Sequence, residues 1–315
     1  MVPEIPEYLT VVCPLPRTSV MDKKSAGIAR AFFYADFYQA ALTVSIPTMR
    51  LNDFIGPGIL LMATLLSVSA DAADISAAAG LLYFDYQEFS LTGESLNHET
   101  GALPGISVAA REKMFGLDHS LAFTFWQGQV DYRGLTQAGA PHTTKTEQDI
   151  YIIDYRLDWR PKDTAGGLYG KLGWQNWDRN IQPANGVNGL FERYQWWSLE
   201  AGLHIDLYQA GNHKLFTEFG GLATTHGTIK IDLRNSGYGY PTLDLGDGTG
   251  IAVRAGWSSR LDDKSSLSIL FDYTRWDFDR SDSETIPANT GSITITEPES
   301  RSKRAGLSFI YQFSF

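Results

Sequence analysis

Apolar and polar residues alternate one by one along most of the chain from about residue 79 to its end. In the segment 197–207, Trp, Leu, Ala, Leu, Ile and Leu fill the odd positions, while Ser, Glu, Gly, His and Asp fill the even ones. Because successive side chains of a strand point to opposite faces, this pattern predicts β-strands with one apolar and one polar face. The predicted strands lie at about residues 79–91, 105–115, 119–132, 147–159, 167–179, 194–209, 213–230, 249–261, 265–279 and 300–314.

The connections between these strands alternate in length. Long connections rich in Gly, Pro, Asn, Ser and Thr fall at about 92–104, 133–146, 180–193, 231–248 and 280–299. An even number of long strands, joined by short and long connections in turn, is typical of a closed up-and-down transmembrane β-barrel. Closure pairs every backbone N–H and C=O group, as lipid requires. We therefore expect an all-β fold of about ten antiparallel strands, with short periplasmic turns and long extracellular loops.

The strands of a soluble β-sandwich or a lipocalin-like barrel would also show alternating apolar and polar residues. The predicted strands are long, however, against a usual length of about 5–6 residues in soluble proteins. The chain also holds 8 Trp, 15 Tyr and 17 Phe, and many of them cluster near predicted strand ends, as in the aromatic girdles of membrane barrels. Both features favour the membrane barrel.

One apolar stretch, residues 55–70, precedes the alternating region. It is short for a membrane helix, which needs about 20 residues. It has the length of a signal-peptide core, and Ala-Asp-Ala at 70–72 supplies the small-x-small cleavage pattern. We expect a cleaved signal peptide over 49–72 and a barrel domain over 73–315. A buried core helix is the alternative for the apolar stretch.

Residues 1–48 would precede a complete export signal, so we interpret them as a start-site overcall. A genuine unstructured extension and a long leader are the alternatives. The single cysteine, Cys13, lies in this segment, which leaves the expected barrel domain without a disulfide. The net charge of −10 argues against nucleic acid as a partner, because phosphate binding needs a basic surface.

Aromatic residues alternate in the last predicted strand, at Phe309, Tyr311, Phe313 and Phe315. This ending resembles the terminal targeting signal of bacterial outer-membrane β-barrel proteins. The resemblance implies a Gram-negative outer membrane, insertion by the barrel-assembly machinery, and contact with membrane lipid and lipopolysaccharide. It does not identify a subfamily, and we expect a monomer.

The polar faces of the predicted strands carry charges of both signs. We expect the following residues to form a charge network in the lumen: Asp85, Arg111, Asp154, Arg156, Lys171, Glu200, His204, Glu218, Arg254 and Asp272. A ten-stranded barrel is only slightly wider than an eight-stranded one, whose interior side chains fill. Unpaired charges there would be costly, so ion pairs should link them into a polar plug. A narrow conduit is the alternative.

Candidate catalytic chemistry is sparse. Asp277-Phe278-Asp279 resembles one half of the catalytic pattern of the omptin proteases, whose barrels also have ten strands, but the partner Asp-x-His pair is missing. His204-Ile205-Asp206 has the reverse order. His226-Gly227-Thr228 is weakly similar to the His/Ser sites of lipid A deacylase barrels. If the chain is an enzyme with a site at the extracellular rim, Asp277, Asp279 and His226 are the first residues to test.

His98 and His142 are expected in loops and His226 at the outer end of its strand, and none of the three has metal-ligand spacing to another histidine. We expect no metal and no cofactor. The loops are acidic, with Glu99 and Glu297 among their carboxylates, which fits either a solvated exterior or cation-bridged contact with lipopolysaccharide. The sequence therefore predicts a non-enzymatic outer-membrane barrel of structural, surface-exposed or small-pore type.

Overall fold

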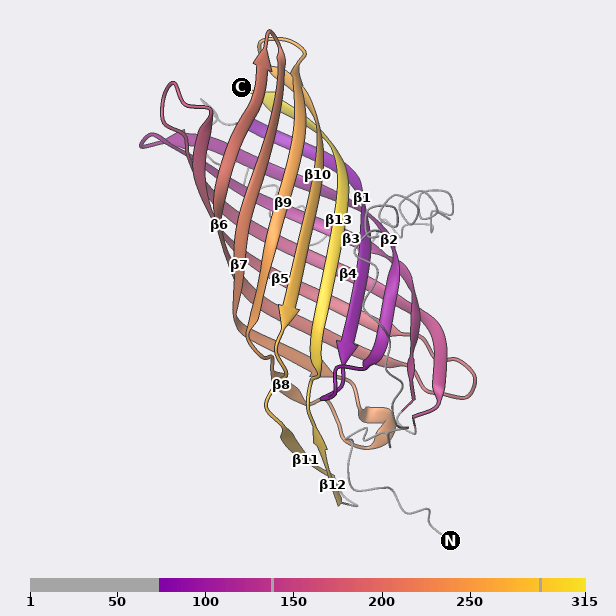
Figure 1. The fold of residues 1–315 in the computed structure, drawn as a ribbon. Coiled ribbons are helices and arrows are strands. Elements are labelled where there is room, and N and C mark those ends of the chain that lie inside the picture. Colours follow the sequence, from indigo (N-terminus) through magenta and orange to yellow (C-terminus); the bar gives the residue numbers. More distant parts are fainter. Residues whose placement is uncertain (1–73, 137–138, 289–290) are drawn as a thin grey trace, which may run out of the picture.

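The computed structural model describes residues 74–136, 139–288 and 291–315, so the expected signal peptide and residues 1–48 lie outside the described residues. Ten long antiparallel strands form one closed barrel, as predicted (Figure 1). Each strand pairs with its neighbour along the chain, and the last pairs with the first. The barrel strands are β1 (Asp74–Phe89), β2 (Ser95–Met114), β3 (Leu117–Leu135), β4 (Pro141–Trp159), β5 (Gly166–Ile181), β6 (Leu190–Ala210), β7 (His213–Ile231), β9 (Gly248–Arg260), β10 (Ser265–Phe278) and β13 (Glu299–Ser314).

The two ends of the barrel differ. At the turn end, short connections join the strands; between β2 and β3, Phe115 and Gly116 both have positive φ (53° and 80°), as a two-residue hairpin turn requires. The opposite, loop end carries shorter elements that extend past the barrel strands (Figure 1). They are η2 (Arg234–Ser236), β8 (Thr242–Asp244), β11 (Glu284–Ala288) and β12 (Gly291–Ile295). No described helix is long and apolar enough to cross a membrane.

Some strands reach further towards the loop end than predicted. Residues 95–104 belong to β2 and residues 141–146 belong to β4, so the prediction that both segments are loops was wrong. His98, Glu99 and His142 accordingly lie in strands. In these two extensions the outer face of the strand includes polar residues, so apolar and polar residues no longer alternate as they do in the other predicted strands. Backbone pairing with the neighbouring strands nevertheless continues.

An apolar belt surrounds the turn-end part of the barrel. On β4 the odd-numbered residues from Tyr151 to Trp159 face outward and all are apolar or aromatic, whereas the next outward residues are Asp149, Glu147 and Lys145. Eight residue steps of about 3.3 Å give about 26 Å along this strand, which is on the order of the lipid-facing band of outer-membrane barrels. The strands therefore continue beyond the belt on the loop side.

The barrel interior has two levels. The loop-end half is packed with buried side chains, while the turn-end half encloses a cavity of about 580 Å³. The cavity has small side chains on β1, β2, β3 and β13, including Ser76, Ala109, Ser120 and Ser308, and its larger charged side chains come mainly from β4 to β9. The packed core consists of Leu82, Phe84, Tyr86, Leu103, Trp126, Val130, Ile150, Trp177, Tyr194, Trp196, Ile229, Leu243, Ile286 and Ile295.

Candidate functional site in the barrel interior

A buried arginine holds the loop-end half of the lumen together. Arg179 on β5 is 1% exposed and forms ion pairs with carboxylates from three other strands. Its guanidinium nitrogens lie 2.9 Å from Glu88 of β1, 2.7 Å from Glu99 of β2 and 2.5 Å from Glu192 of β6. Glu99 also accepts a hydrogen bond from Gln148 (2.6 Å). These bonds cross the lumen, so the group, here called the Arg179 cluster, ties opposite walls together.

Aromatic rings and loop residues fill the space around the Arg179 cluster. The Trp177 ring lies 5.0 Å from that of Tyr86 and 4.7 Å from that of Tyr194, as measured between centroids. Leu243 of β8, together with Ile286 and Ile295 of the β11–β12 hairpin, packs onto this core from the loop side. Buried side chains therefore pack together in the loop-end half of the lumen.

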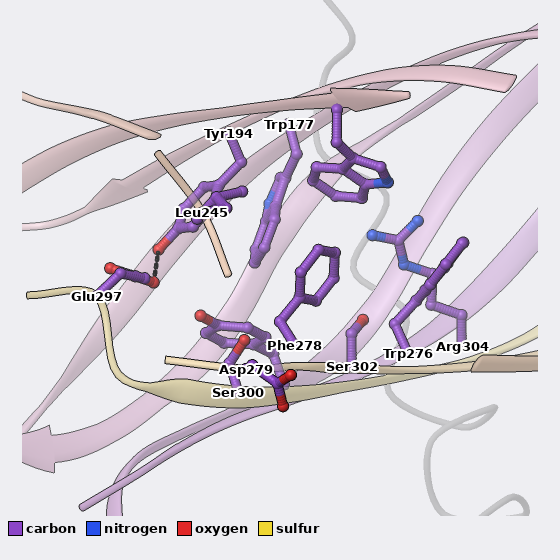
Figure 2. A pocket seen from close by; sticks show the side chains of 12 residues that line it. Trp177, Tyr194, Leu245, Trp276, Phe278, Asp279, Glu297, Ser300, Ser302 and Arg304 are labelled. Atoms are coloured by element: carbon purple, nitrogen blue, oxygen red, sulfur yellow. Dashed lines mark hydrogen bonds between the residues drawn. The ribbon is translucent and has the colours of Figure 1, made fainter. Parts of the chain in front are cut away.

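Glu297, from the connection between β12 and β13, adds a further acid to this region. The Tyr194 hydroxyl lies 2.9 Å from Glu297 (Figure 2). It also lies 3.3 Å from Glu192. One hydroxyl proton can satisfy only one of these acceptors at a time. Burial raises the pKa of Glu297 well above its usual range, and the negative charges of Glu88 and Glu192 raise it further. The environment thus favours the neutral, protonated form of Glu297.

A second charge network lines the turn-end cavity. Arg156 of β4 donates two hydrogen bonds to Glu218 (both 2.8 Å) and two to Asp158 (2.9 and 2.6 Å). Arg254 of β9 donates two hydrogen bonds to Glu200 (2.6 and 3.0 Å). Bidentate pairs of this kind are stronger and more directional than single ion pairs. The ion pairs link five cations, Arg156, Arg160, Lys171, Lys214 and Arg254, to five carboxylates, Asp154, Asp158, Glu200, Asp206 and Glu218.

Tyr169 sits in the middle of this cavity network. Its hydroxyl donates to Glu200 (2.8 Å), and the Arg156 guanidinium lies 4.1 Å from its ring centroid. The ring lies over Gly202 and Gly220 on the two following strands, where a Cβ at Gly202 would come within 2.6 Å of it. The two glycines therefore leave room for the tyrosine.

His204 belongs to the same network. Its Nδ1 lies 2.9 Å from Glu218 and its Nε2 lies 2.6 Å from Asp206, and the side chain is 2% exposed. An imidazolium ion would satisfy both contacts with its two N–H groups. Within the described residues no group of three His, Cys, Asp or Glu side chains is arranged to hold a metal ion.

The structure places the other predicted lumen residues as follows. Arg111 pairs with Asp118 (2.9 Å) at the turn end, and Asp272 faces the cavity. The prediction for Asp85 was wrong: this side chain lies on the outer face, 3.4 Å from His98. Glu99, expected in an exposed loop, is fully buried, and His142 is buried as well.

The candidate catalytic residues do not form one site. Asp277 lies on the outer face of β10, where Arg275 (2.7 Å) and Arg301 (2.6 Å) bind its carboxylate. Asp279 lies just beyond the end of β10 and is exposed. His226 lies in β7, and its side chain lies outside the described part of the chain. Because His204 and Asp206 lie near the turn end of β6, the structure does not bring them together with Asp277 and Asp279.

Sequence reasoning missed Arg179, Glu88 and Glu192. Arg179 shares the odd-numbered face of its strand with Lys171, so alternation alone could have placed it in the lumen. Glu192 lies two residues before the predicted start of its strand, where no apolar outer face marks the extension.

No protein-family model matches the chain, and the comparison with curated proteins found no match. Among solved structures, the fold is similar to the outer membrane protease OmpT from Escherichia coli, with a TM-score of 0.51 and 9% sequence identity over 80% of this chain and 100% of that one. Weaker similarity extends to the translocator domain of the autotransporter NalP from Neisseria meningitidis (TM-score 0.38, 13% identity, 89% and 99% coverage). It extends also to the toluene transporter TodX from Pseudomonas putida (TM-score 0.33, 9% identity, 80% and 93% coverage). At such identities the likeness to OmpT concerns the barrel fold.

Proposed function

We propose that the chain is a non-enzymatic outer-membrane barrel protein whose lumen is closed towards the cell surface and hollow towards the periplasm. The observation that carries this proposal is the Arg179 cluster, which joins β1, β2, β5 and β6 across the lumen on the loop side of the Tyr86, Trp177 and Tyr194 rings. Ions crossing the barrel would have to pass through this packed core. The arrangement favours a structural or surface-exposed barrel rather than a small pore.

The outer surface supports the proposed location. The apolar belt lies nearer the turn end, as in barrels whose short turns face the periplasm. Phe309 and Tyr311 point outward from β13 within this belt and are 54% and 48% exposed. We infer that they serve, with Phe313 and Phe315, as the targeting signal for the assembly machinery, and that the belt contacts lipid and the loop end contacts lipopolysaccharide.

Planar-bilayer conductance tests the closed lumen. The purified chain should give no steady conductance steps. The double variant Trp177→Gly, Arg179→Gly, which removes one large ring and the central cation of the core, should give them if it inserts. Steady steps from the unaltered chain would support the small-pore interpretation instead. Heat-modifiable migration on SDS gels and recovery in the outer-membrane fraction test the barrel and its location.

An enzyme with a site at the extracellular rim is the alternative. This alternative has less support, because Asp277 faces outward and its carboxylate forms ion pairs with two arginines. Incubation of the purified barrel with peptide and lipid A substrates tests it directly. Turnover by the unaltered chain that is lost in Asp279→Ala or His226→Ala would replace the non-enzymatic proposal.

A further inference from the structure

Arg304 is a buried arginine that forms no ion pair with a carboxylate of the residues described by the structure. It points inward from β13 at the boundary between the packed core and the turn-end cavity, is 5% exposed, and lines both spaces. Its Nη1 donates across the lumen to Gln175 of β5 (3.0 Å). Its Nε and Nη2 have no hydrogen-bond partner within the described part of the chain. Among the described residues, no carboxylate oxygen lies within 4.0 Å of the guanidinium.

This isolation is unfavourable for a guanidinium. An arginine side chain stays protonated in proteins, and an unpaired charge removed from water costs several kcal/mol. Arg156, Arg179 and Arg254 each bind carboxylates inside the same barrel. Asp272 is the carboxylate whose charge acts on Arg304, but it lies two residues nearer the turn end, opposite Gly306. A compensating negative charge is therefore expected close to Arg304.

A small space beside Arg304 is lined by further unsatisfied donors. About 10 Å³ of this space is open to the centre of a water-sized sphere, so it can hold at least one small molecule or ion. Tyr86, Trp196 and Ser302 line it. Among residues 74–136, 139–288 and 291–315, the buried atoms Tyr86 Oη, Trp196 Nε1 and Ser302 Oγ have no hydrogen-bond partner. The indole N–H can only donate, and both hydroxyls can donate. Three of the residues that line this space can therefore donate a hydrogen bond to an acceptor.

Glu297, one of the two acids that line the same space, lies at its other end. Figure 2 shows Arg304, Ser302 and Trp276 on one side, with the Phe278 ring between them and Glu297. Glu297 is hydrogen-bonded to Tyr194 at that far end. The Arg304 guanidinium and the Ser302 hydroxyl therefore lie at one end of the space, away from Glu297.

We propose that this end of the space is a binding site for one small monovalent anion of halide size. Arg304 Nε and Nη2, Trp196 Nε1 and Ser302 Oγ would donate to it. A water molecule would satisfy some of these donors but would leave the guanidinium charge uncompensated. Since Arg304 also lines the turn-end cavity, the ion would enter from there. The site does not depend on whether the barrel conducts ions.

Halide titration with the full barrel in detergent tests this site. At constant ionic strength, replacing sodium gluconate by sodium bromide should raise the thermal unfolding temperature saturably, and crystals in bromide should show an anomalous peak beside Arg304. Arg304→Gln should lose both signals. Arg301→Gln, on the outer face of the same strand, should keep them.

A milder variant keeps the test decisive if Arg304→Gln fails to fold. Trp196→Phe retains an aromatic ring but removes the indole donor, and it should weaken bromide binding about tenfold, the effect of one lost hydrogen bond to an ion. Equal unfolding temperatures in gluconate and bromide, with no anomalous peak at Arg304, would overturn the proposal and assign the space to water. Bromide stabilisation that persists unchanged in Arg304→Gln would overturn it as well.

Discussion

Replacing Arg179 with methionine should destabilise the barrel strongly. Methionine keeps much of the side-chain volume but removes the cation, which leaves Glu88, Glu99 and Glu192 buried together without compensation. Breaking a buried pair in this way costs about 3–5 kcal/mol. Urea unfolding in lipid vesicles, followed by tryptophan fluorescence and by gel migration, would measure the loss in unfolding free energy.

Arg193→Met supplies the matched control. Arg193 binds Asp178 through two hydrogen bonds, but it lies on the outer face with 41% of its side chain exposed. Exposed pairs contribute about 0.2–1 kcal/mol, so this variant should lose no more than that. Adding Glu99→Gln and Glu192→Gln to Arg179→Met should restore part of the lost stability, because two buried charges are removed. Equal losses of unfolding free energy in Arg179→Met and Arg193→Met would refute the assignment of Arg179 as the residue that joins the walls of the lumen.

Two further predictions concern the loop end and the cavity. Burial raises the pKa of Glu297, so its neutral form stabilises packing of the 279–298 connection against the barrel core. This stabilisation is complete below the usual carboxyl pKa and is lost as the pH rises through the raised pKa. Limited proteolysis of this connection should therefore increase with pH, and Glu297→Gln should abolish the trend; an unchanged trend would exclude Glu297 as its cause. Gly202→Val should cost about 1–3 kcal/mol in urea unfolding, because the added Cβ would clash with the backbone oxygen of Phe219 and lie 2.6 Å from the Tyr169 ring. Gly221→Val, at an open position on the outer face, should change stability by less than about 0.5 kcal/mol, and equal losses in the two would contradict the packing argument.

The sequence predicted the barrel because its strands in the apolar belt have two chemically different faces. The prediction failed where this contrast disappears. In β1 the inward residues Phe84 and Tyr86 fill the packed core while outward Tyr83 belongs to the belt, so both faces are aromatic and the orientation of Asp85 is ambiguous. For Glu99 the contrast is lost in another way: this residue lies in the extension of β2, where the outer face includes polar residues, as the inner one does.

The charge network was only partly predictable. Alternation places Arg156, Glu218 and Arg254 on inward faces, but which residues pair depends on the register between neighbouring strands. The isolation of Arg304 depends on contacts across the lumen, since its hydrogen-bond partner Gln175 is 129 positions away in the chain. Local pattern contains no information about such contacts.

Accessibility of the cavity from each side of the membrane tests the central proposal most directly. With Cys13 replaced by serine, single cysteines would be introduced at Ser120, which lines the cavity, and at Thr92, which is exposed at the loop end. Intact cells would be treated with a maleimide attached to a polymer too large for general porins. We predict rapid labelling of Thr92→Cys from outside and labelling of Ser120→Cys only after the periplasm is opened. Labelling of Ser120→Cys in intact cells at the rate of Thr92→Cys would contradict a lumen closed towards the cell surface.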